Sequence, residues 1–162
     1  MSIADKLTTI AENQERVFEA GKKSEYDAFW DNFQDNGARR NYQYGFGYFW
    51  GDTNFKPKYP IIFGLGYTGA YCFWNTTVSN LAERLEEQGV YMDTTLCGHW
   101  ANMFQLCKTS RIPELNCTHA HEYYATYGLY YTFVDCTVET IDKMIVTENL
   151  KYSYAFMRCT NL

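Results

Sequence analysis

A short motif, Phe-x-x-Cys, recurs in the last third of the chain and limits what the chain can fold into. Its copies occupy residues 104–107, 133–136 and 156–159, and a weaker copy with Thr in place of Cys occupies 73–76. In the copies at 104 and 133 an isoleucine follows the phenylalanine after eight positions. Successive phenylalanines are 31, 29 and 23 residues apart. A recurrence of this length is typical of a solenoid, in which each repeat buries its apolar face against the next.

We therefore predict an α+β fold in two parts. Residues 1–40 form an N-terminal helix. Residues 41–162 form a short, irregular leucine-rich-repeat-like solenoid with one short strand per repeat, which ends within a repeat. A helix is also predicted inside the second part, over residues 78–88, because its apolar residues fall on one face and Gly89 follows as a helix terminator.

Two apolar stripes indicate the N-terminal helix. A seam with the spacing of a short coiled coil consists of Ile3, Leu7, Ile10, Gln14 and Val17. A second stripe, with the spacing of an amphipathic helix, consists of Tyr26, Phe29, Trp30 and Phe33. The helix either caps the solenoid or serves as an oligomerisation stalk. We favour the stalk for residues 2–18, because an aliphatic seam requires a cover, and we expect a homo-oligomer formed through this helix.

Composition and charge exclude several classes of protein. Hydrophobic residues make up 46% of the chain, which is enough for a core and argues against wholesale disorder. The formal net charge is −5. Adjacent basic residues occur only as the pairs 22–23 and 39–40. Binding to nucleic acid requires a basic surface, so we expect no nucleic-acid partner.

The sequence contains no segment that indicates export or membrane insertion. The first residues lack a basic region followed by an apolar one, and no run of about 18 apolar residues occurs. We expect cytoplasmic synthesis without a signal peptide, in a protein that is then retained, virion-associated or released by lysis. Free thiols are expected for all six cysteines in that reducing compartment. Cys107, Cys136 and Cys159 recur at one phase of the repeat, which is typical of a small buried position.

Residues 64–69 spell Gly-x-Gly-x-x-Gly, the pattern of a dinucleotide-binding turn. In that fold the glycines bring the backbone and a helix N-terminus up to a pyrophosphate. The residues that would open this helix, 70–77, are poor helix formers. The acidic residues at the required distance, Glu86 and Glu87, belong to a predicted helix and not to the end of a strand. We therefore predict a glycine-rich loop and no cofactor.

Cys117, His119 and His121 form the one cluster in the sequence with metal-ligand chemistry. Alternate residues of a strand share a face, so a thiolate and two imidazoles would converge there. Nothing marks a fourth ligand, although Cys97 and His99 repeat the spacing. A polar strand edge with one small cysteine explains the pattern more simply, so we predict no metal and no catalytic residues.

Aromatic residues are in excess. They make up 19% of the chain, with 15 tyrosines. The phenylalanines of the repeat are expected in the core, whereas other rings alternate with Asn, Thr, Gly and His, a mixture that recognition surfaces use. The alternative is that half or more of these rings fill a thin core. The candidate ligand-binding residues are Tyr67, Tyr71, Trp74, Trp100, Tyr123, Tyr124, Tyr127 and Tyr130.

The Phe-x-x-Cys-Thr phrasing at 133–137 and 156–160, with the apolar residue that follows, resembles the BspA-like leucine-rich repeats of surface and phage-encoded proteins of gut Firmicutes. The opening of the chain and residues 55–59 also look like the start of proteins from such phages. The resemblance implies a curved solenoid with a non-enzymatic role in adhesion or protein recognition, and it supplies no catalytic residues. Tyr, Trp, His and Gly replace the usual aliphatic residues at 67–74 and 119–131.

Three functions follow from these features. The one we favour is a binding or adhesion module that presents its aromatic surface to a protein or glycan. The second is a structural assembly subunit, in which the helix is the working part. The third is a small metal- or thiol-dependent enzyme that uses the cluster at 117–121.

Overall fold

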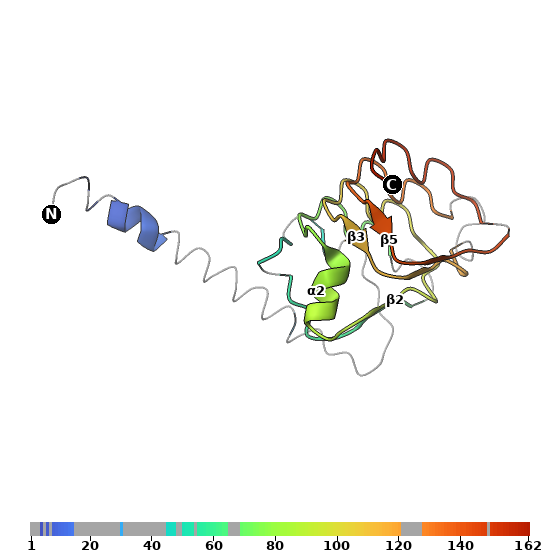
Figure 1. Cartoon of the computed structure of the whole chain (residues 1–162), viewed down its shortest axis with the longest axis horizontal. Coiled ribbons are helices and arrows are strands. Elements are labelled where there is room, and N and C mark those ends of the chain that lie inside the picture. The colour runs from blue at the N-terminus through green and yellow to red at the C-terminus, as the bar shows by residue number, and fades with distance from the viewer. Residues whose placement is uncertain are drawn as a thin grey trace. The chain divides into compact units, whose positions relative to one another are not determined.

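The computed structural model (Figure 1) describes residues 4, 6, 8–14, 30, 45–47, 50–53, 55–64, 69–120, 128–148 and 150–162. The chain divides into two compact units, Met1–Gln34 and Asp35–Leu162. In the first unit every described residue is helical. Ile10 is 53% exposed there, whereas Trp30 is buried. The other apolar residues of the two predicted stripes lie outside the described residues. No helix in the described part of the chain is long and apolar enough to cross a membrane.

The second unit contains one described helix and six strands of two residues each. These are β1 (Ile61–Ile62), α2 (Leu81–Glu87), β2 (Met92–Asp93), β3 (Arg111–Ile112), β4 (Leu115–Asn116), β5 (Thr140–Ile141) and β6 (Met144–Ile145). The strands pair in parallel as β1 with β2, β3 with β5 and β4 with β6. Ile112 lies opposite Ile141, so the isoleucines of the Phe-x-x-Cys repeat are neighbours in one sheet.

The helix α2 confirms the prediction for residues 78–88, with tighter boundaries. It begins after Asn80, whose side-chain oxygen accepts a hydrogen bond from the backbone N–H of Glu83. Leu81 and Leu85 are buried on its inner face. Gly89 adopts a φ of +65°, the left-handed conformation that ends a helix at little cost for glycine.

Four turn segments make up much of the rest of the unit: residues 69–76, 100–107, 129–136 and 152–159. Each is a succession of tight turns in which an N–H donates to the carbonyl three residues earlier, as Cys107 does to Phe104 at 3.1 Å. Each also contains two non-glycine residues with positive φ, four positions apart. These left-handed residues are Tyr71, Asn75, Asn102, Leu106, Tyr131, Asp135, Tyr154 and Arg158.

Neighbouring turn segments are hydrogen-bonded side by side. The Phe73 N–H donates to the carbonyl of Met103 at 2.8 Å, and the Phe104 N–H donates to that of Thr132 at 2.8 Å. The Phe133 N–H donates to Ala155 at 2.8 Å in the same manner. Backbone N–H groups therefore alternate between bonds within a segment and bonds to the next one, which satisfies the buried backbone.

The phenylalanines at the centre of these segments stack into one column, which begins with Phe46. Ring centroids are 5.1 Å apart from Phe46 to Phe73, 5.3 Å from Phe73 to Phe104, 5.4 Å from Phe104 to Phe133 and 4.9 Å from Phe133 to Phe156. All of these rings except Phe156 are fully buried. Each buried phenylalanine contributes roughly 1.5–3 kcal/mol by leaving water. The column is thus the core of the unit, as the spacing of the repeat predicted.

The predicted leucine-rich-repeat-like solenoid over residues 41–162 is wrong. Such a fold joins one strand from every repeat into a continuous parallel sheet. The described residues instead form three separate two-stranded sheets, and the turn segment 152–159 contributes no strand. The physical reason is the run of turns, because left-handed residues interrupt the extended backbone that a longer strand requires. The chain is an α+β mixture of short helices, small parallel strand pairs and mostly irregular coil.

Replacing Phe104 with Ala removes a ring that has a stacked neighbour on both sides. The neighbours are held in place by backbone hydrogen bonds and cannot close the gap, so we expect a loss of about 3–5 kcal/mol in the free energy of unfolding. Chemical denaturation followed by circular dichroism measures this loss. Tyr91→Ala is the control, because that side chain is 57% exposed. Equal losses in the two variants would contradict the assignment of the column as the core.

Candidate functional site

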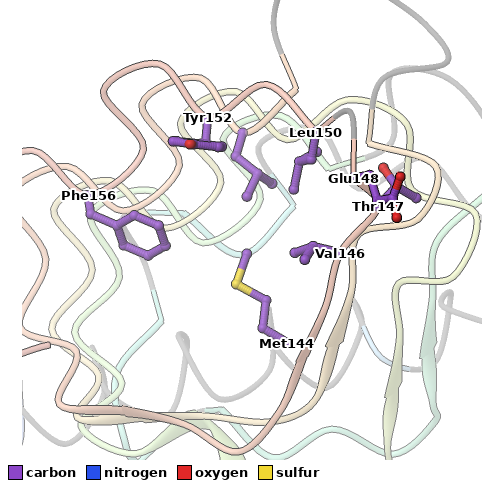
Figure 2. Close-up of a pocket in the computed structure, with 8 residues that line it drawn as sticks. Met144, Val146, Thr147, Glu148, Leu150, Tyr152 and Phe156 are labelled. Carbon is purple, nitrogen blue, oxygen red and sulfur yellow. The ribbon is translucent and has the colours of Figure 1, made fainter.

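A hollow of about 330 Å³ lies beside the last ring of the phenylalanine column (Figure 2). Its walls come from three parts of the chain: the start of the turn segment 129–136, the strand β6 with the residues that follow it, and the turn segment 152–159. The lining residues are Leu129, Met144, Val146, Thr147, Glu148, Leu150, Tyr152 and Phe156.

Backbone pairing positions these walls. Strand β6 is parallel to β4, with Met144 opposite the buried Leu115. The hydrogen bond from the Phe133 N–H to Ala155 holds the segment 152–159 against its neighbour. Figure 2 shows Met144 and Val146 reaching into the hollow, with Phe156 across from Val146. The walls of the hollow are therefore held in place by backbone hydrogen bonds.

The hollow is lined mostly by apolar side chains, and its polar groups belong to Thr147, Glu148 and Tyr152. Val146 is 53% exposed, Tyr152 is 68% exposed and Phe156 is 39% exposed, which is unusual for side chains of this size gathered in one place. The hydroxyl of Thr147 is buried and has no hydrogen-bond partner among the described residues, a condition that costs free energy until a partner arrives. Glu148, which is exposed, supplies the only carboxylate of the lining.

A cluster of three tyrosines occupies the same two turn segments. Tyr131 and Tyr154 are stacked, with centroids 5.3 Å apart and ring planes 12° apart. Tyr130 meets Tyr131 edge-on at 4.2 Å and Tyr154 edge-on at 6.4 Å. Tyr131 and Tyr154 stack because both stand at the first left-handed position of their segments. Tyr154 is 60% exposed, so the tyrosine cluster offers contact area to solvent.

An ion pair ties these two segments together. Arg158 donates from Nε and Nη2 to the two carboxylate oxygens of Asp135, each at 2.5 Å. These hydrogen bonds lower the pKa of the Asp135 carboxyl from its usual 3.8. Both residues stand at the second left-handed position of their segments. The pair therefore joins the two segments at equivalent positions.

The structure describes four of the eight predicted aromatic site residues, and it places Trp100 apart from the other three. Trp100 is fully buried and donates from Nε1 to the carbonyl of Cys97 at 2.7 Å, so it packs in the core. Tyr71 and Trp74 are half-buried and meet edge-on at 5.6 Å, and Tyr130 joins the tyrosine cluster. Outside the described residues lie Tyr67, Tyr123, Tyr124 and Tyr127.

Sequence reasoning missed Tyr131, Tyr152 and Tyr154, together with the apolar residues of the hollow. A signal for them exists: residues 152–156 read Tyr-Ser-Tyr-Ala-Phe, with an aromatic at every second position. This alternation indicates the aromatic residues at 152, 154 and 156 as candidates, whereas the Phe-x-x-Cys motif indicates Phe156 alone.

The structure buries the cysteine of the candidate metal and thiol cluster. Cys117 is fully buried, and burial raises the pKa of its thiol to about 12, which disfavours the thiolate that a nucleophile or metal ligand requires. His121 lies outside the described residues. Within the described ranges no three His, Cys, Asp or Glu side chains converge as a metal site.

The glycine pattern at 64–69 leads into a turn segment and not into a helix. Residues 65–68 lie outside the described residues. Gly69 has a packing role, because a side-chain carbon there would stand 2.6 Å from Cys97 Sγ and 3.0 Å from the carbonyl oxygen of His99. The close approach of residues 97 and 99 of the same chain explains why glycine occupies this position, and no bound nucleotide is needed to explain it.

Comparison with known proteins found no protein-family model, curated protein or solved structure that matches the chain. The resemblance to BspA-like repeats therefore stays a prediction.

The Asp135–Arg158 pair makes a prediction about pH. Because its folded-state pKa is lowered, Asp135 stabilises the pairing of the two segments above its ordinary pKa of 3.8, and this contribution is lost as the pH falls through the folded value. An NMR titration of the carboxyl should give a midpoint below 3.8. Arg158→Gln should return the midpoint toward the ordinary value, whereas Lys143→Gln, whose side chain pairs with Glu114, should leave it unchanged. A midpoint at or above 3.8 in the unaltered chain would exclude the pairing.

Proposed function

We propose that the chain is a non-enzymatic binding module that engages a protein through the hollow and the adjoining tyrosine cluster. The carrying observation is the hollow itself, in which exposed Val146, Tyr152 and Phe156 surround an apolar space. Binding energy at protein interfaces concentrates where an apolar or aromatic anchor fills such a space. The tyrosines beside it supply broad contact area at low entropic cost.

A protein suits this site better than a glycan. A sugar carries hydroxyls around its ring, and each one that is buried needs a hydrogen-bond partner. Only Thr147, Glu148 and Tyr152 among the lining residues carry polar side-chain groups. An apolar side chain of a partner, such as leucine or phenylalanine, matches the remaining wall and leaves fewer polar groups unpaired.

Charge specifies the partner further. Glu148 stands at the hollow, and the whole chain has a net charge of −5. Complementary potentials speed association and select among partners. The proposed partner therefore presents an apolar anchor with lysine or arginine close by, in a segment that can place a donor near Thr147.

Peptide display tests this function, because a random library does not require the partner to be identified. Random peptides selected on the full chain should converge on an apolar anchor flanked by basic residues. Val146→Asp places a charge in the hollow at a side chain already 53% exposed, and it should weaken the selected peptides by at least about tenfold, or roughly 1.4 kcal/mol. Tyr91→Asp, the matched exposed control, should bind like the unaltered chain.

Two outcomes would contradict the proposal. Selected peptides that bind Val146→Asp and the unaltered chain equally would exclude the hollow. Failure of peptide selection together with capture on a glycan array would favour a glycan ligand at the tyrosine cluster.

The second candidate, an assembly subunit that oligomerises through the N-terminal helix, is favoured by one observation. Ile10 is 53% exposed on that helix, and an aliphatic side chain in a predicted seam is stabilised when another helix covers it. Analytical ultracentrifugation of the full chain should then show an oligomer that Ile10→Asp converts to a monomer. Thr9→Asp is the control for added charge on the same helix. A monomeric unaltered chain at micromolar concentration would remove this candidate.

A further inference from the structure

Two cysteines stand one above the other in adjacent turn segments. Cys136 and Cys159 each follow a phenylalanine of the column by three positions, and the rings of Phe133 and Phe156 stack at 4.9 Å. The two Sγ atoms are 3.2 Å apart. A disulfide needs neighbouring backbones with side chains directed at each other, and stacked segments in register supply that arrangement.

We infer that Cys136 and Cys159 are a modification site, at which a small-molecule disulfide oxidises the two thiols to an intramolecular disulfide. The inference is independent of the proposed binding function, because it uses neither the hollow nor a partner.

Access selects this pair among the six cysteines. Cys159 is the only one with partial exposure, and Cys136 is 4% exposed. The remaining four, Cys72, Cys97, Cys107 and Cys117, are fully buried. Cys107 stands at the same position of the preceding segment, but no oxidant reaches it from solvent. A reagent therefore meets Cys159 first and finds one thiol within reach of it.

The exposure of the two thiols indicates which one reacts first, because Cys159 is the partly exposed one and Cys136 is buried. In the reduced pair, Cys159 Sγ lies within hydrogen-bond distance of the carbonyl of Phe133 and of Cys136 Sγ. Burial raises the pKa of the Cys136 thiol to about 12, which keeps it protonated at neutral pH. Cys159 is thus the attacking sulfur, and Cys136 is the resolving one.

The reaction balances in two exchange steps. Cys159 loses its proton to solvent and, as a thiolate, attacks one sulfur of the small disulfide. The S–S bond of the reagent breaks, and the released thiolate takes a proton from solvent to become one small thiol. Cys136 then loses its proton to solvent and attacks the Cys159 sulfur, and the second small thiol leaves. One protein S–S bond has formed, the protein has lost two electrons, and the reagent has been reduced to two thiols.

The link would clamp the exposed segment 152–159 to the segment 129–136. In the reduced chain the two are joined by backbone bonds such as that from Phe133 to Ala155, by the Asp135–Arg158 pair and by ring stacking. A disulfide between the two segments removes the conformations in which the segment 152–159 detaches from the segment 129–136. The oxidised chain is therefore expected to hold Tyr152 and Tyr154 more firmly than the reduced one.

Glutathione disulfide is the probe, applied to the reduced, folded full chain. Intact-mass analysis should show the loss of two hydrogens without retained glutathione. After tryptic digestion, the peptide 112–143 should be linked to 159–162, and fragmentation should place the bond on Cys136 and not on Cys117. Linkage of this pair should exceed every other pair by at least about tenfold, whereas a urea-unfolded sample should lose that selectivity.

Variants separate the two roles. Cys136→Ser should retain glutathione on Cys159. Cys159→Ser should form no disulfide link, and it should take up glutathione more slowly than Cys136→Ser does. Cys117→Ala, the matched buried control in the same tryptic peptide, should form the link as the unaltered chain does. Glutathione that stays on Cys159 of the unaltered chain, or a link that joins other cysteines in the folded state, would overturn the inference.

Discussion

The stacking of phenylalanine rings is the interaction on which the second unit depends. The centroids of successive rings in the column from Phe46 to Phe156 are 4.9–5.4 Å apart. This distance is close to the spacing of roughly 4.8 Å between backbones that are hydrogen-bonded side by side. Rings and backbone amides therefore satisfy the same separation. This coincidence allows short turns to pack as a core without long strands, and it places Tyr131 over Tyr154 and Cys136 beside Cys159.

The phenylalanine column could be predicted from the sequence, whereas the fold around it could not. Equal spacing from phenylalanine to isoleucine placed Phe104 and Phe133 at one phase, and their stacking is confirmed. The helix α2 was also predictable from its apolar face and Gly89. The expected solenoid is wrong because left-handed turns replace extended strands. Tyrosine, leucine or arginine occupies five of those eight left-handed positions, and none of these residue types marks positive φ in a sequence as glycine, asparagine or aspartate does.

The candidate site was less predictable than the core. An excess of aromatic residues indicated a recognition surface, yet composition does not say which rings are covered. Trp100 is buried because its segment lies between two others, whereas Tyr154 is exposed because no described segment covers its own. The hollow depends on Val146 and Phe156, which belong to different parts of the fold and are brought to one place by the pairing of β6 and the stacking of segments.

Hydrogen exchange at single backbone amides tests the central claim most directly. The N–H groups of Phe73, Phe104 and Phe133 each donate to the next turn segment beneath the stacked rings. NMR in deuterated buffer should find these three amides among the slowest of the chain, exchanging only when the whole second unit unfolds. Exchange at these amides as fast as in an unstructured peptide would show that the rings do not hold the segments together.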